Sequence, residues 1–387
     1  MPCTRADVAR ATDGLLPPTT KIESKPENLP SLLGVAHGAH RQCTDRPNAR
    51  NSRCGERRVS VDWHRGFVRT PNGEENRAAG ESALPLVIGV STRALFDCED
   101  EHRVFAQDGE AAYCALLRER ETNPLHPGCA FEFIKRLLAL NAACGAKLVD
   151  VVLLSRNAPD QALRIFNACE ANSLAIVAGS FTGGRPIAPY AEAWGVDLFL
   201  SKDDEDVRAA LGAGIAAARL APTPKQSAPT RQDEVHFALD GDAVTFGAES
   251  EGIFRKAGLS AFERHERLNA HLPLAPGPLG GPLLRKFLAL RSLSKDVNGQ
   301  NRIRISMVTA REAPAHERVL VTLRHWRVLL DEIHFVGYRS KVPFLAAAGA
   351  LIFFDDRATH VDAASHVVAA GQVPADGDLP QSQLSGT

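Results

Sequence analysis

Short apolar runs of strand length recur along most of the chain, and stretches with helical spacing separate them. This alternation is typical of a parallel sheet with helices on its faces, because parallel neighbours need a crossover between them. The expected fold class is therefore α/β. The predicted strands cover residues 86–90, 149–154, 174–177, 197–200, 235–239, 303–308, 332–336 and 351–354.

The predicted strands fall into two sets that resemble each other. A shift of 149 residues aligns Phe105 with Phe254, and a later shift of 154 residues aligns Arg164 with Arg318. Two constant registers, with strands aligned on strands, favour an internal duplication over coincidence. We therefore expect two similar Rossmann-like parallel-sheet units packed as a pair.

Composition divides the chain further. Residues 1–80 scatter Pro, Arg, Asn and Gly among polar residues without a sustained period, which predicts a disordered extension. Its local excess of basic residues leaves open a tether for nucleic acid or an acidic partner. The other expected segments are a first half at 81–220, a Pro-rich linker at 221–230, a second half at 231–371 and a disordered tail at 372–387.

Charge and cysteine usage narrow the function classes. The chain has 45 Lys and Arg against 46 Asp and Glu, a net charge of -1 that argues against a protein built to cover nucleic acid. Apolar runs are too short for a membrane span, and the eight cysteines form no C-x-x-C pair. We expect reduced thiols, a cytoplasmic location, no membrane and a small-molecule partner; a homo-oligomer stays open.

The second half carries charged residues where the first half does not. The aligned pairs are Asp240 with Ser91, Asp242 with Arg93, Lys341 with Ile187 and Asp355 with Ser201. A common scaffold gives no reason for so one-sided a pattern. A functional site in the second half, with a degenerate copy in the first, accounts for it.

Acidic residues follow two of the predicted strands. Asp240-Gly241-Asp242 comes after residues 235–239, and Asp355-Asp356 comes after 351–354. The carboxyl ends of parallel strands share one rim of the sheet, so the carboxylates should gather there. Carboxylates brought together repel unless a cation intervenes, and Mg²⁺ prefers such oxygen ligands.

Two more polar residues should reach the same rim. Thr309 follows the strand at 303–308, and Lys341 lies in the loop after 332–336. A hydroxyl and an ammonium can donate to the oxygens of a phosphoryl group, whose transfer depends on positioning and charge neutralisation. Together with the acidic residues they predict a phosphoryl-transfer site.

In these residues the chain resembles the haloacid dehalogenase (HAD)-like phosphatases, whose motifs run Asp-x-Asp, Thr or Ser, Lys and an acidic pair. Over residues of about 86–370 it also resembles the cytosolic 5′-nucleotidase I family. The matching strings are Val90-Ser91-Thr92-Arg93-Ala94-Leu95-Phe96, Thr182-Gly183-Gly184, Asp240-Gly241-Asp242-Ala243-Val244 and Leu274-Ala275-Pro276-Gly277-Pro278-Leu279. The resemblance implies two HAD-like units and Mg²⁺-dependent hydrolysis of nucleoside monophosphates, AMP foremost. Residues 1–80 match no pattern of that family.

The resemblance also implies roles for the site residues. Asp240 would be the nucleophile that forms an aspartyl phosphate, and Asp242 would be general acid and then general base. Thr309 and Lys341 would hold phosphoryl oxygens, with Arg311 as a further phosphate ligand. Mg²⁺ would bind Asp240, the carbonyl of Asp242, Asp355 and Asp356.

Several interpretations stay open. The enzyme could act on another small phosphate ester, or the chain could be a nucleotide-binding sensor without turnover. A helical cap is expected at about 249–298, where Phe254, Phe262 and His265 either stack on a purine or pack in a core. The degenerate copy, with Ser91, Arg93 and Ser155, either supports packing or binds a regulatory nucleotide. His236 is predicted to be a core histidine rather than a ligand. The segment Thr182-Gly183-Gly184 is predicted to form either a tight turn or an anion-binding nest.

Overall fold

The computed structural model describes residues 60–62, 67–69, 85–121, 123–222 and 233–375. Most of the expected extension, linker and tail lies outside the described residues. Within residues 1–80, β1 (Ser60–Asp62) and β2 (Phe67–Arg69) pair antiparallel, so the expectation of disorder is wrong there. Their β-branched and aromatic residues favour strands. Each strand has only three residues, too few to change the average composition of residues 1–80.

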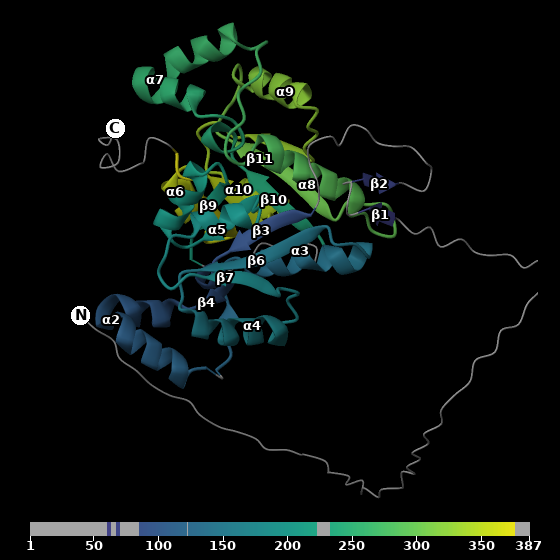
Figure 1. Cartoon of the computed structure of the whole chain (residues 1–387). Helices are drawn as coiled ribbons and strands as arrows, with labels where there is room; N and C mark the ends of the chain where they lie inside the picture. Colours follow the sequence, from purple (N-terminus) through teal and green to yellow (C-terminus); the bar gives the residue numbers. More distant parts are fainter. Residues whose placement is uncertain (1–59, 63–66, 70–84, 122, 223–232, 376–387) are drawn as a thin grey trace, which may run out of the picture. The chain divides into compact units, whose positions relative to one another are not determined.

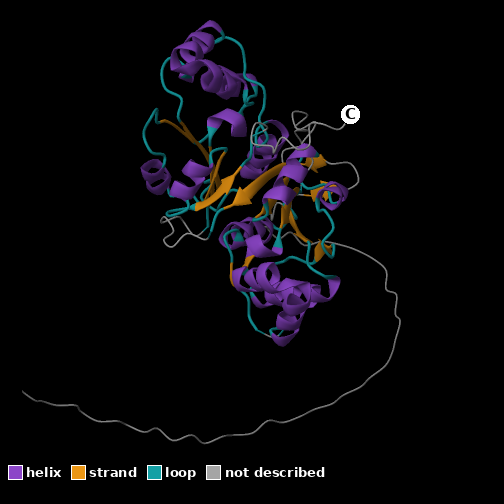
Figure 2. Ribbon diagram, turned by 90° about the vertical axis from the view of Figure 1, so that its left-hand side faces the viewer, coloured by secondary structure: helices purple, strands orange, loops and turns teal. Residues whose placement is uncertain are grey.

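Ten strands form one sheet in the order β12-β11-β10-β13-β14-β9-β8-β3-β6-β7. Figure 2 shows the strands at the centre with helices on both sides, which confirms the α/β class. The strands of this sheet are β3 (Leu86–Val90), β6 (Val149–Ser155), β7 (Ala178–Phe181), β8 (Leu198–Ser201), β9 (Ala216–Leu220), β10 (Val235–Leu239), β11 (Ile303–Thr309), β12 (Glu332–Phe335), β13 (Ile352–Asp355) and β14 (Ala369–Gln372). A separate pair is β4 (Phe96–Asp97) with β5 (His126–Pro127).

The two halves of the sheet have the same strand order: β9-β8-β3-β6-β7 corresponds to β14-β13-β10-β11-β12. Neighbours within each half are parallel, whereas β9 and β14 pair antiparallel where the halves meet. The strands of the two halves therefore run in opposite directions, and their carboxyl ends lie at opposite rims of the sheet. Two similar units predict this repeated order; the duplication itself stays a prediction.

Seven of the eight predicted strands agree with observed strands to within one residue at each end. The strand predicted at 174–177 is wrong, because the chain pairs with β6 only from Ala178 to Phe181. A Cβ on Gly179 would lie 2.7 Å from the carbonyl oxygen of Leu153, so the close approach of β7 to β6 needs a glycine there. Small residues have low strand propensity, which is why the sequence did not predict this strand. Strands β9 and β14 are also rich in Ala and Gly and were not predicted.

Helices cover both faces of the sheet, and the strands alternate between two cores. Phe237 faces α3 and α8, whereas its neighbour Ala238 faces α10 and α11. In the first half α5 and α6 cover the second face. The helices are α1 (Thr92–Leu95), α2 (Glu99–Glu119), α3 (Phe131–Cys144), α4 (Ala162–Ala171), α5 (Ala188–Ala193), α6 (Asp204–Gly212), α7 (Glu249–Leu268), α8 (Gly281–Leu293), α9 (His316–His325), α10 (Val342–Ala348) and α11 (Ala358–Ala364).

Helices α2 and α7 each bend at a glycine in the left-handed region, Gly109 with φ 82° and Gly258 with φ 76°. Figure 1 shows both helices standing away from the sheet. The cap expected at 249–298 is too long, because α8 packs its apolar side under the sheet and fully buries Leu284 and Leu290. Helix α7 is therefore the segment that can cover a site.

Two predicted boundaries are also wrong. The tail expected from residue 372 begins later, because Gln372 belongs to β14 and the N–H of Val373 donates to the carbonyl of Asp355 at 2.9 Å. Ala221, expected in the linker, donates its N–H to the carbonyl of Ala370 at 2.9 Å. The first bond extends the parallel pairing of β14 with β13, and the second extends the antiparallel junction between the halves.

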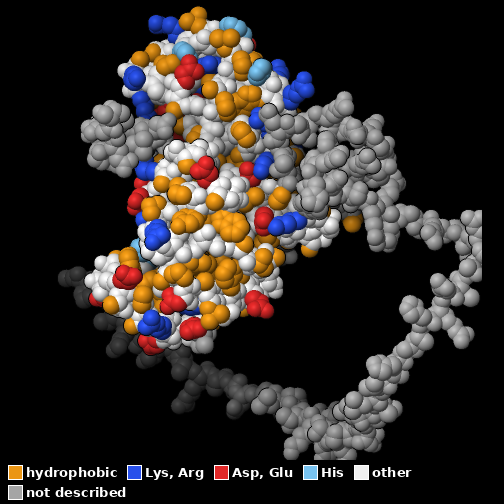
Figure 3. Space-filling model, viewed as in Figure 1, with side chains coloured by type: hydrophobic (Ala, Val, Ile, Leu, Met, Phe, Trp, Pro, Cys, Tyr) orange, Lys and Arg blue, Asp and Glu red, His pale blue; other side chains and the backbone are white. Residues whose placement is uncertain are grey.

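Among the helices of the described residues, none has the length and apolar character needed to cross a membrane. The face in Figure 3 intersperses Lys and Arg with Asp and Glu, so no continuous basic surface forms on it. This distribution agrees with the near-zero net charge of the chain.

Candidate active site

Three neighbouring strands of the second half end at the predicted site. Asp240 directly follows β10, Thr309 ends β11 and Asp355 ends β13. These strands are parallel, with Leu239 opposite both Met307 and Phe354, so the three polar residues lie at one rim. Sheet register thus brings together residues that are far apart in the sequence.

The turn after β10 is held by close contacts. A Cβ on Gly241 would lie 2.8 Å from Oγ1 of Thr309, so a larger residue here would force the side chain of Thr309 to shift. The hydroxyl of Thr245 donates to the carbonyl of Asp240 at 2.7 Å. The residue with left-handed backbone is Ala243, at φ 59°, rather than the glycine. A strained turn of this kind is common where side chains are positioned for function.

Asp240, Asp355 and Asp356, named here the acidic cluster, are all buried and offer oxygens within 4.8 Å of one another. Lys341, at the start of α10, is buried between two of them. Its Nζ lies 2.8 Å from Oδ1 of Asp240 and 2.7 Å from Oδ2 of Asp355. Two of the three carboxyl groups therefore share one buried ammonium.

The three carboxyl groups respond differently to burial. Desolvation, partly offset by Lys341, raises the pKa of Asp240 to about 6. Desolvation and the charges of Asp240 and Asp355 raise the pKa of Asp356 to about 8. For Asp355 burial also acts upward, but hydrogen bonding to His360 and the ammonium of Lys341 outweigh it and lower the pKa to about 2. The cluster is thus short of positive charge.

The donor set of the acidic cluster suits a divalent cation. Oδ2 of Asp356 is buried and accepts no hydrogen bond from the described residues, and the nearest cation, Nη2 of the partly exposed Arg255, is 3.6 Å away. A buried oxygen without a partner is costly, and a hard metal ion supplies the missing contact. The carboxylates of Asp240, Asp355 and Asp356 would be its protein ligands.

Asp242 belongs to the same rim but contacts a different partner. Arg311 donates from Nε to Oδ2 of Asp242 at 2.8 Å and from Nη2 to Oδ1 at 2.7 Å. Such a bidentate pair fixes the plane of the carboxylate. The backbone N–H of Arg311 also donates to Oγ1 of Thr309 at 3.2 Å, which leaves the hydroxyl hydrogen of Thr309 free to donate elsewhere.

The residues at this rim are those of the four predicted motifs, and comparison with known proteins identifies the family of the chain. The family model described as 5′-nucleotidase matches residues 79–378. The chain belongs to the 5′-nucleotidase family. The match covers both halves of the sheet, so the first half is part of the region that the family model describes rather than an unrelated domain.

A curated relative extends the comparison. The chain is 34% identical over 290 residues to human "Cytosolic 5'-nucleotidase 1B", an alignment that covers 72% of this chain and 47% of the human protein. The chain thus spans about half the length of that relative. No solved structure matches the chain significantly.

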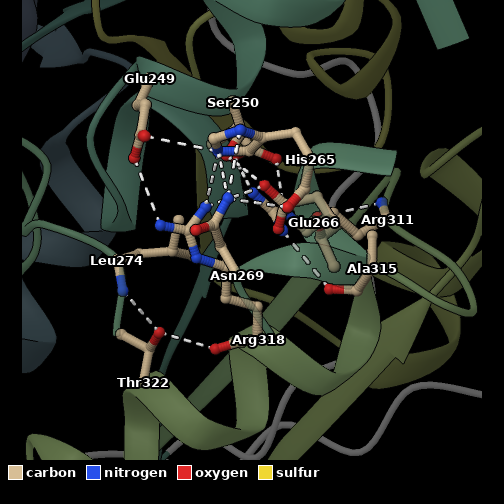
Figure 4. Close-up of polar contacts among 12 residues, drawn as sticks. Glu249, Ser250, His265, Glu266, Asn269, Leu274, Arg311, Ala315, Arg318 and Thr322 are labelled. Carbon is tan, nitrogen blue, oxygen red and sulfur yellow. Dashed lines mark hydrogen bonds and ion pairs between the residues drawn. The ribbon is translucent and has the colours of Figure 1, made fainter. Parts of the chain in front are cut away.

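In this member of the 5′-nucleotidase family, a buried network connects the site to α7. Glu266 accepts hydrogen bonds from Nη1 of Arg311, from Nη1 of Arg318 at 3.0 Å and from Oγ of Ser250 at 2.7 Å. Figure 4 shows this carboxylate between the two guanidinium groups. Because Arg311 also holds Asp242, a residue of α7 helps to fix a carboxylate at the strand ends.

Sequence reasoning missed Glu266 and His360. Neither belongs to a motif, and Glu266, in the part of α7 after the bend at Gly258, contacts a residue that lies 45 positions away in the sequence. A weak signal existed for Arg318, since Arg164 occupies the same place in the first half. Nothing in the sequence marked His360, whose Nδ1 lies 3.1 Å from Oδ2 of Asp355.

Phe254, Phe262 and His265 all lie in α7, and the rings of Phe254 and Phe262 contact each other edge to face. The guanidinium carbon of Arg311 lies 5.4 Å from the ring centroid of Phe262, and His265 contacts Arg318. Both residues therefore contact the network around Glu266. Stacking on a purine stays a prediction. His236 is fully buried, with Nε2 2.8 Å from Oγ of Ser306, as expected of a core histidine.

The Thr182-Gly183-Gly184 segment forms a turn. The N–H groups of Gly183 and Gly184 donate to the backbone carbonyls of Asn157 and Arg156, at 3.0 and 2.7 Å. Both donors are already used, which favours the tight turn over the anion-binding nest.

Proposed function

We propose that this protein is a cytoplasmic, Mg²⁺-dependent 5′-nucleotidase that hydrolyses nucleoside monophosphates, AMP in particular, to nucleoside and phosphate. One observation carries the proposal: in a chain of the 5′-nucleotidase family, Lys341 is buried between Asp240 and Asp355 beside a third carboxylate, Asp356. The name of the human relative supports the substrate class and the location.

Asp240 is the nucleophile in this proposal. Its contacts with Lys341 and with the N–H of Gly241 both go to Oδ1, at 2.8 and 2.6 Å. Oδ2 is therefore the oxygen that attacks phosphorus in line, giving an aspartyl phosphate and expelling the 5′-oxygen of the nucleoside. Covalent catalysis divides one difficult displacement into two easier ones.

Asp242 supplies the proton transfers. It gives a proton to the leaving 5′-oxygen and then removes one from the water that hydrolyses the aspartyl phosphate. The bidentate contact with Arg311 holds the carboxylate in place for both steps. Because the nitrogens of Arg311 contact Asp242, Glu266 and the carbonyl of Ala315, we assign it this positioning role, and direct contact with phosphate stays a prediction.

Charge neutralisation falls to Lys341, Thr309 and the cation. Lys341 and the hydroxyl of Thr309 donate to phosphoryl oxygens that gain charge in the transition state. When bound by the acidic cluster, Mg²⁺ would offset the negative charge of carboxylates and phosphate so that the two can approach. The carbonyl of Asp242 as an additional ligand, a regulatory nucleotide and a homo-oligomer remain predictions.

Phosphate release from the full chain tests the proposal. AMP, IMP, CMP, UMP and their deoxy forms are compared with Mg²⁺ and with EDTA, alongside Asp240→Asn and the matched control Asp362→Asn, an exposed aspartate of α11. We expect AMP to be preferred, EDTA to abolish release, and Asp240→Asn to lower turnover by about three orders of magnitude or more. Full activity in EDTA, or in a folded Asp240→Asn variant, contradicts the mechanism. Ribose 5-phosphate is assayed beside the nucleotides, and its preference over AMP contradicts the substrate class.

A further inference from the structure

The shared strand order identifies which first-half residues correspond to the acidic cluster. Ser91 follows β3 as Asp240 follows β10, and Ser201 ends β8 as Asp355 ends β13. The next residue is Lys202, at the place of Asp356. Carboxylates of the second half are therefore replaced by two hydroxyls and an ammonium, and Arg93 stands at the place of Asp242.

The two serines are built into the sheet as their counterparts are. The N–H of Ser91 donates to the carbonyl of Leu200 at 2.9 Å, as the N–H of Asp240 does to Phe354 at 2.8 Å. Both serine side chains are buried, and both accept a backbone N–H, from Ala94 at 3.3 Å and from Asp203 at 3.1 Å. The O–H group of each serine is free to donate a hydrogen bond, because it donates to no acceptor among the described residues.

The two cations meet at one carboxylate. Nη2 of Arg93 lies 3.2 Å from both oxygens of Glu99, and Nζ of Lys202 lies 2.9 Å from Oε1. Nε of Arg93 is buried and donates to no described residue. Glu99, in the first turn of α2, is 41% exposed. An anion thus already occupies the position between the cations, on a side chain that can turn into solvent.

We propose that Ser91, Arg93, Ser201 and Lys202, the donor cluster, bind the phosphate group of a small phosphate monoester without a metal ion. A site with only donors selects an anion, just as one with only carboxylates selects a cation. A phosphate dianion carries more charge and more acceptor oxygens than the carboxylate of Glu99, so it displaces that side chain.

A cavity whose lining includes the residue before Glu99 can hold the organic part of the ester. Its volume is about 320 Å³, and its lining includes Cys98, Tyr113 and Asn157. Cys98 directly precedes Glu99, and the N–H of Asn157 donates to Oγ of Ser155 at 3.1 Å. The lining offers the ring of Tyr113 and the amide of Asn157, which suit a polar organic group. Its charged residues are Glu101, Glu121, Asp160, Arg118 and Arg164.

The donor cluster is separate from the candidate active site. The strands of the two halves run in opposite directions, so their carboxyl ends lie at opposite rims of the sheet. A ligand there cannot be the substrate bound at the acidic cluster, and binding does not depend on the proposed hydrolysis.

Calorimetric titration of the full chain with inorganic phosphate in EDTA tests the site. We expect Arg93→Gln with Lys202→Gln to weaken binding about tenfold or more, since each removes a charged donor. The matched control, Arg103→Gln with Lys147→Gln, removes two exposed first-half cations and should leave binding unchanged. Glu99→Gln should tighten binding several-fold, and it gives an independent result if the double variant does not fold.

Titration with ribose 5-phosphate and AMP distinguishes a free phosphate from an ester. Tighter binding of either ester than of phosphate supports the role of the cavity, and weaker binding of both overturns it. Phosphate affinity that stays the same in the double variant and in Glu99→Gln, or binding that requires Mg²⁺, overturns the donor cluster as a site. None of these measurements uses turnover, so failure of the hydrolase proposal would be seen separately.

Discussion

Replacing Glu266 with Gln tests how far the buried network stabilises the fold. The side chain of Glu266 is 0% exposed and accepts hydrogen bonds from Arg311, Arg318 and Ser250. Glutamine keeps the shape but removes the charge, and its NH₂ group cannot accept from a guanidinium. Arg311 would keep Asp242, and Arg318 would keep the more distant Glu249 at 3.3 Å.

Burial sets the size of the effect. Breaking a buried ion pair by removing one partner costs about 3–5 kcal/mol, and because the amide oxygen still accepts one bond we expect about 3 kcal/mol for Glu266→Gln. Glu249 pairs with the same Arg318, but its side chain is 54% exposed. Glu249→Gln removes the same charge and should cost less than about 1 kcal/mol, since water screens it.

Urea unfolding of both full-length variants, followed by far-UV circular dichroism, provides the comparison. The unfolding midpoint of Glu266→Gln should fall clearly below that of the wild type, and that of Glu249→Gln should stay close to it. Equal midpoints for the two variants would refute the conclusion that burial of Glu266 makes the network stabilising.

Two further substitutions probe other buried groups. Lys341→Met leaves Asp240 and Asp355 without their shared ammonium, so turnover in a phosphate-release assay should fall at least about a hundredfold. The control Lys295→Met, which replaces an exposed lysine, should keep the wild-type rate. A small loss of turnover in Lys341→Met would contradict the role of Lys341. Burial, with a smaller contribution from Arg304, lowers the pKa of His236 from 6.5 to about 4. The unfolded chain therefore takes up a proton between pH 6.5 and 4 that the folded chain does not, and stability is lost as the pH falls through this window, by up to about 3 kcal/mol. Urea unfolding from pH 7 to 4 should show a steeper loss for wild type than for His236→Gln, and the reverse order would contradict the assignment.

The sequence predicted the parts of the fold that depend on local pattern. Apolar runs such as 86–90 and 235–239 gave strands with the observed bounds, because β-branched and aromatic residues buried on both faces leave a continuous signal. Strand β14, with the sequence Ala-Ala-Gly-Gln, has no such signal and forms because β9 and β13 flank it. Tertiary pairing, rather than propensity, creates that strand.

The candidate site divides in the same way. Asp240, Thr309, Lys341 and Asp355 could be named because each follows or ends a strand, or lies in the loop after one, and parallel strands deliver their carboxyl ends to one rim. Glu266 could not, since its position depends on the bend of α7 at Gly258 and on a guanidinium 45 residues away. A residue that acts through another side chain has no fixed spacing from the motifs, so the sequence alone does not identify it.

The first half supports the site whether or not it binds a ligand. The ring centroids of Phe133, in α3, and Phe237, in the strand that ends before Asp240, lie 5.3 Å apart. Nζ of Lys286, in α8, lies 2.7 Å from Oδ2 of Asp197 in the first half. The sheet itself continues from β14 into β9. Removing the first half would expose the core beneath β10 and leave β14 as an open edge strand, a common route to aggregation. The first half can therefore support the site without carboxylates at the corresponding places, where Ser91, Ser201 and Lys202 stand instead.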